Sequence, residues 1–441
     1  YQDIQTVALK KYTDKPVTVN GTGFATNSIN YYDSYRSLDC YAFDSYPGMH
    51  HTRISSFPYG FARGVKSGTP FWILEFMSGG GHGLRGHGRR QTPPGSLKQA
   101  TVHAMAHGAQ MLLHFQFRTF PYGAEQLNYA IVDMDGVPRR RYYEMQETAA
   151  LLNRLEPLEK AQMKNQAAIV VDYDAYWALK IKPVHESFQY ITFCSEFYTA
   201  LDDLGYGSDL VNLDADWSGY KLLVIPAMFV LNRSYRDKIR HYVENGGTVL
   251  ATFLTSVKTV DNTGYTESLP AGLTEVFGVT VQEVEPIDNS TVSSLELKLS
   301  GKPMLTQDHY WSELLDGTAE MKGVYTEDYK KGQGVISHNA YGKGHAWYMG
   351  TMPEKQAFTA LLEEVSHEAG LRKNGIRVPD CCEVVRREYE GQGLYYIFNF
   401  AAQSQKAEWT GTLRSVLDDT SYTDGAEIPA DGFLILQGET T

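Results

Sequence analysis

The stretch Thr69-Pro70-Phe71-Trp72-Ile73-Leu74-Glu75 is a short apolar run that ends in a single carboxylate, just before three glycines at 79–81. Such a run predicts a buried β-strand, and an ionised acid at its end costs desolvation energy unless it faces a polar cleft. A catalytic glutamate would occupy this kind of position. The alternative is a structural carboxylate that caps a neighbouring element or pairs with Arg85 or Arg89.

Composition and charge narrow the class of protein. The chain has 441 residues, of which 42% are hydrophobic and 21% charged, as in globular proteins. This length predicts about two to four domains, and no run reaches the roughly 18 apolar residues that a membrane helix needs. A formal net charge of −12 disfavours a nucleic-acid surface, which would concentrate lysine and arginine. The sequence therefore predicts a soluble protein that binds neither membrane nor nucleic acid.

The cysteines bear on location and cofactors. Cys40, Cys194, Cys381 and Cys382 show no C-x-x-C spacing and indicate neither a zinc site nor a disulfide framework. We therefore expect a reducing, cytoplasmic location and no cofactor. Position 1 is tyrosine rather than methionine, so we expect the natural chain to begin upstream.

Residues 1–160 alternate strand and helix signals. Strands are predicted at 16–20, 38–44, 71–75 and 111–118, with a helix at 96–110 that Ser96 is expected to cap. This alternation indicates βα units with parallel strands. The strands end in Asn20, Asp44, Glu75 and Arg118, and α/β barrels carry their chemistry at the C-terminal ends of the strands. Because a closed barrel needs eight strands, residues 1–160 are predicted to be the second half of a (β/α)8 barrel.

Two further domains are predicted downstream. Residues 161–376 alternate short buried strands with amphipathic helices, which indicates a doubly wound α/β domain. Residues 377–441 show strand signals only, which indicates a small antiparallel β domain.

Several short stretches, in this order, point to a known family. They are Leu38-Asp39, Asp44-Ser45-Tyr46-Pro47, Pro70 to Glu75, Pro94-Gly95-Ser96, Ala106-His107-Gly108-Ala109, Phe115-Gln116-Phe117-Arg118, Gly123-Ala124-Glu125 and Gly342 to Thr351. Together they resemble the family 42 glycoside hydrolases, β-galactosidases with a barrel, an amidotransferase-like domain and a C-terminal β domain. The resemblance implies a homotrimer. Cys194 lies inside a predicted helix rather than on a strand-to-helix turn, so the middle domain is expected to serve assembly.

The resemblance also implies roles for residues. Glu75 falls on the nucleophile of a retaining mechanism, which ends the seventh barrel strand in the family. Glu125 matches a glutamate that holds sugar hydroxyls, whereas Asn128 replaces the family's histidine. Arg118 could orient Glu75 or Glu125 by a bidentate pair or form a structural ion pair. Tyr46 could donate to the nucleophile or pack under its loop.

Other polar residues are weighed as follows. Asp44 is expected among the substrate-binding groups, because it ends the sixth barrel strand. His103 and His107 are expected to be satisfied core or helix-end histidines. A metal pair at His82 and His87 lacks an evident third ligand, so no metal site is expected.

The expected function is hydrolysis of terminal non-reducing β-D-galactose residues from β-galactosides. Retention requires a second carboxyl group about 5–5.5 Å from the nucleophile. In the family that acid precedes the matching region, so we expect it outside this chain. Two alternatives stay open: a non-catalytic sugar-binding or assembly subunit, and a related glycosidase such as an arabinopyranosidase.

Overall fold

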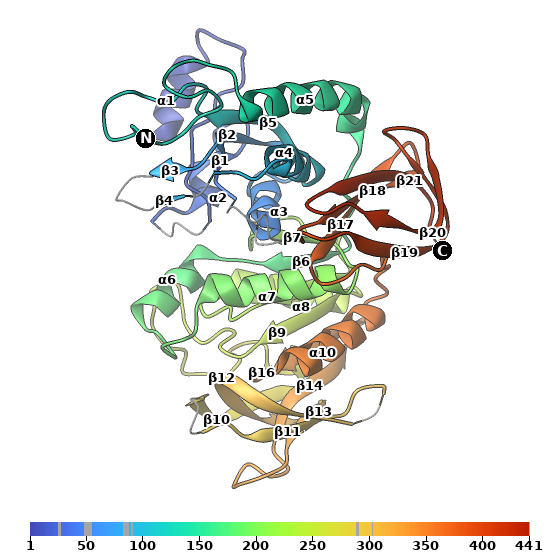
Figure 1. Ribbon diagram of the computed structural model, residues 1–441. Coiled ribbons are helices and arrows are strands. Elements are labelled where there is room, and N and C mark those ends of the chain that lie inside the picture. The colour runs from blue at the N-terminus through green and yellow to red at the C-terminus, as the bar shows by residue number, and fades with distance from the viewer. Residues whose placement is uncertain are drawn as a thin grey trace. The chain divides into compact units, whose positions relative to one another are not determined.

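The computed structural model describes residues 1–24, 28–47, 55–82, 88, 89, 91–287, 291–301 and 303–440, of which 82, 88 and 89 are described by backbone alone. The chain forms two compact units. Unit 1 combines Tyr1–Lys164 with Asn374–Thr441, and unit 2 is Asn165–Lys373. The blue, cyan and red segments of Figure 1 are therefore one unit, in which the first and third regions of the sequence fold together.

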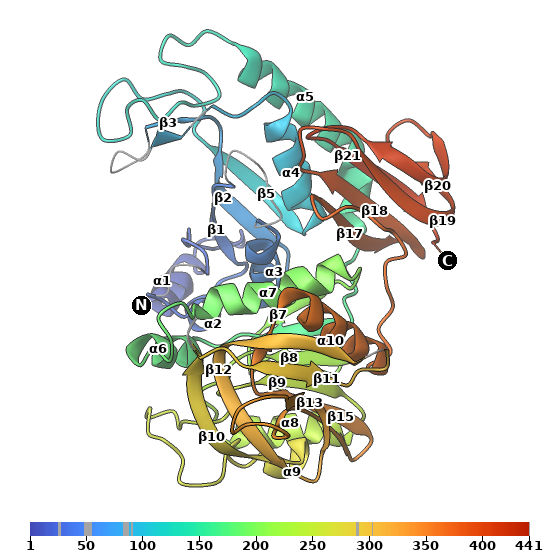
Figure 2. The same cartoon turned by 60° about the horizontal axis from the view of Figure 1, so that its bottom comes forward.

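The first part of unit 1 is built on a parallel sheet of three strands in the order β1-β2-β5. The strands are β1 (Ala42–Ser45), β2 (Phe71–Met77) and β5 (Ala109–Phe115). Helices α3 (Ser56–Val65) and α4 (Ser96–Ala106) connect them, as the βα pattern predicts (Figure 2). The central strand β2 buries Phe71, Ile73 and Phe76 completely, so the apolar run that opens this region lies in its core.

The strand predicted at 16–20 is not a regular strand. This segment meets β1 through one parallel bridge, between Gly21 and Phe43. Side-chain hydroxyls replace the missing ladder: Thr18 donates to the Cys40 carbonyl at 2.8 Å, and Tyr35 lies 2.9 Å from the Val19 carbonyl. The segment therefore runs beside β1, and the Tyr35 hydroxyl lies between the Val19 carbonyl of the segment and the Ala42 carbonyl of β1.

The remaining helices of unit 1 lie around this sheet. They are α1 (Gln2–Leu9), α2 (Tyr31–Ser34), α5 (Arg140–Leu155) and a 3-10 turn at Glu156–Lys160, and a short ribbon pairs β3 (Gly81–His82) with β4 (Gly88–Arg89). Ser96 does not cap α4, because it is the first helical residue. Glu144 of α5 caps the helix instead, accepting from the Leu97 and Lys98 amides at 3.0 and 3.3 Å.

The C-terminal part of unit 1 is an antiparallel sheet in the order β17-β18-β21-β19-β20. Its strands are β17 (Cys382–Tyr389), β18 (Gln392–Asn399), β19 (Gln405–Ser415), β20 (Ser421–Ile428) and β21 (Phe433–Gly438). The sequence predicted four of them and missed β20, whose residues are largely exposed. This sheet is confirmed as antiparallel throughout.

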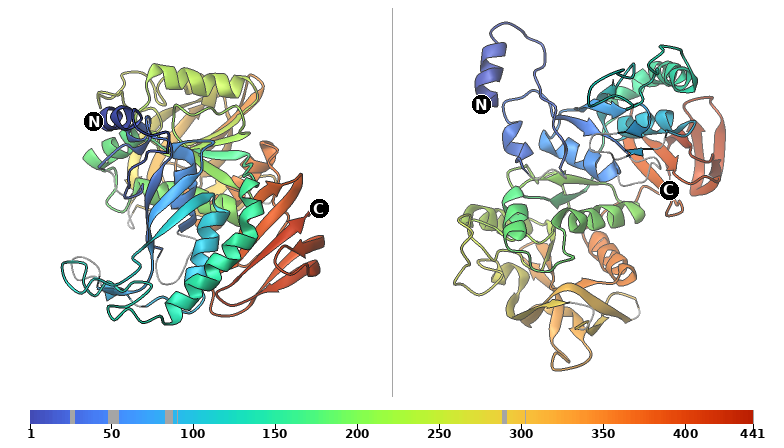
Figure 3. Two further views of the ribbon diagram at one scale, coloured as in Figure 1. Left: turned by 90° about the horizontal axis from the view of Figure 1, so that it is seen from above. Right: turned by 60° about the vertical axis from the view of Figure 1, so that its left-hand side comes forward.

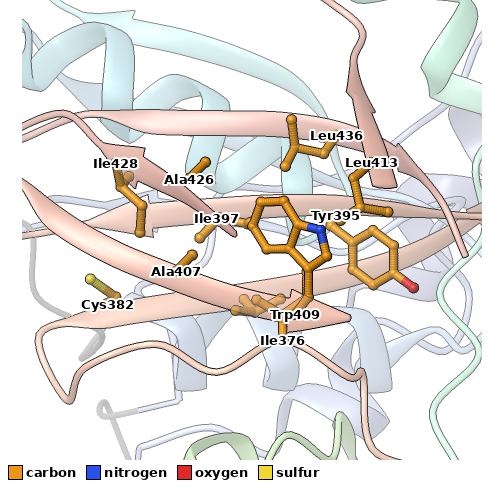
Figure 4. Close-up of a cluster of buried hydrophobic side chains, with 11 residues drawn as sticks. Ile376, Cys382, Tyr395, Ile397, Ala407, Trp409, Leu413, Ala426, Ile428 and Leu436 are labelled. Carbon is orange, nitrogen blue, oxygen red and sulfur yellow. The ribbon is translucent and has the colours of Figure 1, made fainter. Parts of the chain in front are cut away.

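Both faces of this sheet are buried, because alternate residues point to opposite sides. Tyr395 and Ile397 enter a core with Trp409, which Figure 4 shows between the strands. Tyr396 and Phe398 enter a second core, which includes Val102 and Ala106 of α4 and Leu155 of α5. Helices α4 and α5 accordingly lie between the parallel sheet and the C-terminal sheet (Figure 3, left).

Unit 2 holds one mixed sheet of 11 strands. Its parallel part runs β15-β9-β8-β6-β7 and comprises β6 (Ala167–Val170), β7 (Ser208–Val211), β8 (Leu222–Ile225), β9 (Thr248–Thr252) and β15 (Gly344–Met349). The connecting helices are α6 (Tyr173–Ile181), α7 (Tyr190–Asp203), α8 (Arg233–Glu244), α9 (Thr274–Phe277) and α10 (Lys355–Glu368). Figure 2 shows α7 and α10 on one face of these strands and α8 on the other.

An antiparallel extension of this sheet was not predicted. It consists of β10 (Val279–Ile287), β11 (Ser294–Leu297), β12 (Met304–Gly317), β13 (Glu320–Tyr325) and β14 (Gly334–Tyr341), with β16 (Met352–Pro353) beside β12. These strands carry many exposed polar residues, so they lack the apolar runs that reveal the parallel strands. Among the described helices of both units, none is long and apolar enough to cross a membrane.

Candidate active site

Glu75 lies near the C-terminal end of β2, two residues before the strand ends at Met77. Its carboxylate is half-buried and accepts two hydrogen bonds. Asn20 donates to Oε1 at 3.2 Å, and the Tyr46 hydroxyl donates to Oε2 at 2.6 Å. Both donors are neutral, so they orient the carboxylate without an opposite charge. Arg85 and the side chain of Arg89, the alternative partners, lie outside the described residues.

Irregular strand pairing turns Glu75 toward these donors. The register between β1 and β2 shifts after Phe43, and the register between β2 and β5 shifts between Ile73 and Phe76. Leu74 and Glu75 are both half-buried, so the in-and-out alternation of the strand breaks at this point. Bulges of this kind re-aim a side chain at the end of a strand.

Asp44 stands opposite Glu75 in the β1–β2 register. Burial and the charge of Glu75 raise the pKa of Asp44 to about 6, although a hydrogen bond from Asn20 opposes the shift. Its Oδ1 is buried and has no hydrogen-bond partner among the described residues. Asp44 is thus a second acid beside Glu75, and its buried oxygen could carry a proton.

Glu125 and Asn128 lie together in the loop that follows β5. Asn128 Nδ2 donates to Glu125 Oε2 at 3.3 Å, and both side chains are half-buried. The loop is tied to the segment after Glu75, because the Tyr129 amide donates to the Gly80 carbonyl at 2.9 Å. A Cβ on Gly81 would stand 2.1 Å from the Leu127 carbonyl oxygen, so only glycine permits this contact.

Among the described residues, Arg118 forms neither the bidentate pair with Glu75 or Glu125 nor a structural ion pair. Its Nε and Nη2 donate to the Met134 carbonyl at 3.1 and 2.6 Å, and the side chain is exposed. The guanidinium lies against Gly136. Within the described part of the chain, Arg118 therefore organises its own loop rather than orienting Glu75 or Glu125.

The two helix histidines are buried, as expected, and both pair with Glu383, but the buried Nδ1 of His103 has no hydrogen-bond partner among the described residues. His103 Nε2 lies 2.8 Å from Glu383 Oε2, and His107 Nε2 lies 3.0 Å from Glu383 Oε1. Ser56 donates to the same carboxylate at 2.8 Å. Since His103 and His107 belong to α4 and its C-terminal cap and Glu383 to β17, the cluster joins the two parts of unit 1.

Burial and the pairing between the groups act on this cluster in opposite directions. Burial lowers the pKa of His107 to about 4, against the attraction of Glu383. Burial alone would raise the pKa of Glu383, but the two histidines outweigh it and hold that pKa well below its ordinary value. Arg63 Nη1 approaches His107 Nδ1 at 3.3 Å, which leaves Nε2 as the protonated nitrogen that donates to Glu383.

Sequence reasoning missed two of these residues. Asn20 was recognised as a polar strand end but not as a donor to Glu75, and Glu383 was not singled out. Only the fold brings Asn20 to Glu75 and Glu383 to the histidines, across 55 and 276 or more residues of sequence. The pair weighed at His82 and His87 lies outside the described residues and side chains.

Two family models match consecutive parts of the chain. A model described as beta-galactosidase matches residues 1–155, and one described as beta-galactosidase trimerisation domain matches residues 165–372. Both are models of glycoside hydrolase family 42, and together they cover most of the chain. Both descriptions fall within one class of protein, the glycoside hydrolases. The chain belongs to glycoside hydrolase family 42.

Similar proteins extend over nearly the whole chain. Beta-galactosidase BgaA from Clostridium cellulovorans is 28% identical over 96% of this chain and 65% of its own length. Beta-galactosidase BgaA from a Planococcus species is 26% identical over 97% of this chain and 64% of its own length. The chain thus spans slightly less than two thirds of these relatives.

Solved structures show the same fold. The beta-galactosidase from Bacillus circulans sp. alkalophilus superposes with a TM-score of 0.93 at 24% identity, over 99% of this chain and 66% of that one. The polyextremophilic enzyme from Halorubrum lacusprofundi gives a TM-score of 0.86 at 26% identity, over the same shares.

Proposed function

We propose that the protein is a retaining β-galactosidase in which Glu75 is the nucleophile. The observation that carries this proposal is the setting of Glu75, a strand-end carboxylate held at both oxygens by neutral donors. The beta-galactosidases among its relatives supply the reaction class. A nucleophile must be aimed at the reacting carbon, and Asn20 and Tyr46 hold the Glu75 carboxylate in place without adding an opposite charge.

In the proposed reaction, a Glu75 oxygen attacks the anomeric carbon of a terminal β-D-galactose. The bond to the leaving oxygen breaks while that oxygen gains a proton, and a glycosyl ester forms on Glu75. Water then attacks the same carbon and releases galactose with net retention. Tyr46 loses its charged acceptor when the ester forms and regains it when the ester is hydrolysed, so its hydrogen bond follows the charge on Glu75.

The proton donor is proposed to be a carboxyl group that does not belong to the 441 residues of this chain. Asp44 is the described acid beside Glu75, but the two occupy directly opposed positions on adjacent strands. The donor must instead stand across the glycosidic oxygen from the nucleophile. Asp44 is better placed to exchange hydrogen bonds with a sugar hydroxyl next to the reacting carbon.

Recognition of the sugar is assigned to the loop after β5. Glu125 would accept hydrogen bonds from sugar hydroxyls. Charge-assisted bonds of this type favour the binding of one epimer over the other by about 2 kcal/mol. Asn128 already donates to Glu125 and would hold its orientation. Arg118 would contact substrate only from the rim of the site, since its guanidinium is engaged by Met134.

The proposed partners are a β-galactoside and two further copies of the chain. The trimerisation model matched at residues 165–372 supports a homotrimer assembled through unit 2. Cys194 of α7 is buried, and burial raises its pKa far above the ordinary range, so its thiol stays protonated. This supports an assembly role for unit 2 rather than cysteine chemistry. A cytoplasmic location stays a prediction.

Covalent trapping tests the proposal. The complete enzyme would be incubated with an activated 2-deoxy-2-fluoro-galactoside, digested and mapped by mass spectrometry. We expect one fluorosugar on Glu75 and none in Glu75→Gln. Glu147→Gln, an exposed glutamate on α5, is the matched control and should label as the native protein does. A label on any other residue contradicts the assignment, and galactose binding without any turnover favours a sugar-binding subunit.

A further inference from the structure

Unit 2 contains a second cluster of two histidines and a glutamate, unrelated to the site at Glu75. His338 lies on β14, His345 on β15, and Glu368 is the last residue of α10. In the β14–β15 hairpin His338 is opposite Trp347 and His345 is opposite Ala340. The two histidines are therefore diagonal neighbours on one face of the hairpin, the face on which α10 ends.

Three atoms of this cluster converge on one point. His338 Nε2 lies 3.1 Å from His345 Nδ1 and 3.0 Å from Glu368 Oε1, and His345 Nδ1 lies 3.4 Å from the same oxygen. Around a tetrahedral zinc ion, bonds of about 2.0–2.1 Å place neighbouring ligand atoms roughly 3.3 Å apart. The triangle formed by these three atoms has those dimensions.

Hydrogen bonds alone do not satisfy the triangle. Suppose that His338 Nε2 carries a proton and donates it to Glu368 Oε1. If His345 Nδ1 is also protonated, its hydrogen faces the hydrogen on His338 Nε2. If His345 Nδ1 is unprotonated, its lone pair faces the charged oxygen Oε1. Either arrangement sets like partial charges 3.1 or 3.4 Å apart. Exchanging the roles of the two rings gives the same conflict. A cation at the centre would attract all three atoms at once.

The surrounding groups prepare these atoms as ligands. Trp347 Nε1 donates to Glu368 Oε2 at 2.6 Å, which fixes the carboxylate and leaves Oε1 facing the histidines. Glu320 Oε2 lies 3.7 Å from His338 Nδ1, while Lys322 holds the other oxygen of Glu320 at 3.0 Å. A carboxylate behind a ligating imidazole is the usual support in metal sites, because it favours the tautomer whose other nitrogen is free.

Access also fits an ion. The side chains are 16%, 37% and 24% exposed for His338, His345 and Glu368, so an ion could enter from solvent and keep a water ligand.

The buried cluster of unit 1 provides a contrast. There each oxygen of Glu383 pairs with a different histidine, and the group beside His107 Nδ1 is the donor Arg63 rather than a carboxylate. His107 Nε2 must then carry a proton and cannot offer its lone pair. The same three residue types form a hydrogen-bonded cluster in unit 1.

We propose that His338, His345 and Glu368 bind a divalent transition metal ion, with water as the fourth ligand, and thereby tie the end of α10 to the β14–β15 hairpin. Two imidazoles and one carboxylate suit zinc, whereas magnesium and calcium require sites built mainly of oxygen. The site stands apart from Glu75 and does not depend on the glycosidase assignment.

Zinc titration of the complete protein tests this site. Isothermal calorimetry and metal analysis after dialysis should give one zinc per chain at this site and no response to magnesium. His345→Ala and Glu368→Gln should each weaken binding by more than about 100-fold, beyond the roughly 10–100-fold typical of losing a supporting group. Glu320→Gln removes only such a support and should cost about tenfold.

The controls keep the result specific. His367→Ala removes a histidine next to Glu368 that is not part of the cluster and should bind zinc normally, as should Glu75→Gln. Cobalt substitution should give the visible absorption of a four-coordinate site, which the His338→Ala/His345→Ala double variant loses while keeping its circular dichroism. The proposal is overturned if the native protein binds no zinc, or if this double variant binds zinc as the native protein does.

Discussion

Two glutamates of unit 1 occupy opposite kinds of surroundings. Glu75 is half-buried, and each of its oxygens accepts from one neutral donor, Asn20 or Tyr46. Glu383 is fully buried and accepts from His103, His107 and Ser56. Within the described residues, the first carboxylate accepts two hydrogen bonds and the second accepts three, so Glu75 has more of its acceptor positions left for a ligand.

The contrast separates the surroundings of the proposed nucleophile from those of a structural carboxylate. Burial costs both side chains hydration, but at Glu383 the protein replaces the lost hydration with three donors. At Glu75 the protein supplies only the two donors that orient the carboxylate, so a substrate can bind its remaining acceptor positions. We therefore expect substitutions at Glu75 to affect catalysis and substitutions at Glu383 to affect stability.

The largest effect is expected from Glu75→Gln. Removing the nucleophile should lower kcat of the complete enzyme by about 10⁴-fold or more, since the covalent step is lost. The thermal midpoint should change little, because the amide oxygen can still accept from Asn20 and the amide NH2 can donate to the Tyr46 hydroxyl oxygen. Steady-state kinetics and calorimetry measure the two quantities. An active Glu75→Gln enzyme would remove the distinction between the two glutamates.

Glu383→Ala is expected to act in the opposite way. It leaves His103, His107 and Ser56 without their shared acceptor and opens a cavity between α4 and β17. Breaking a buried cluster of this kind costs about 3–5 kcal/mol. Denaturant unfolding should show this loss, while any folded fraction keeps the native KM. A neutral Glu383→Ala variant would show that the cluster contributes no stability.

Acid should weaken the cluster around Glu383. The folded-state pKa of His107 is about 4, below its ordinary value of 6.5, because burial disfavours the charged ring. Stability from this residue is therefore complete above pH 6.5 and is lost as the pH falls toward 4, by roughly 3 kcal/mol. The lowered pKa of Glu383 has the same sign at more acidic pH.

The matching variant is His107→Gln, which can still donate to Glu383 but cannot take up a proton. Its stability should vary less between pH 6.5 and 4 than that of the native protein, as measured by urea unfolding across that range. An unchanged pH dependence would assign the acid sensitivity to other groups.

Tyr46→Phe should produce a smaller change at Glu75. Loss of the 2.6 Å hydrogen bond removes one of two groups that aim the carboxylate, and we expect a decrease in kcat of about 10–100-fold with little change in stability. Asn20→Ala removes the longer bond and should cost less, about 3–10-fold. Reversal of this order would mean that Asn20 rather than Tyr46 sets the position of Glu75.

Much of the site could be predicted because its signals are local. An apolar run ending in a carboxylate identifies Glu75, and the βα alternation places it at a strand end. The partners of that carboxylate could not be derived in the same way, because Asn20 and Glu75 are 55 residues apart and meet only through the pairing of intervening strands. Arg118 shows the converse, since its sequence position suggested a carboxylate partner and the loop supplied the Met134 carbonyl instead.

The sequence by itself determined the parallel strands, the C-terminal β sheet and the strand-end position of Glu75, the proposed nucleophile, because buried strands and helices leave periodic apolar patterns. Only the tertiary structure decided the pairing of α4 with β17, the antiparallel extension of unit 2 and the two clusters of histidine and glutamate. Those features depend on contacts between polar residues far apart in the chain, and a single polar residue carries no periodic signal of its partner.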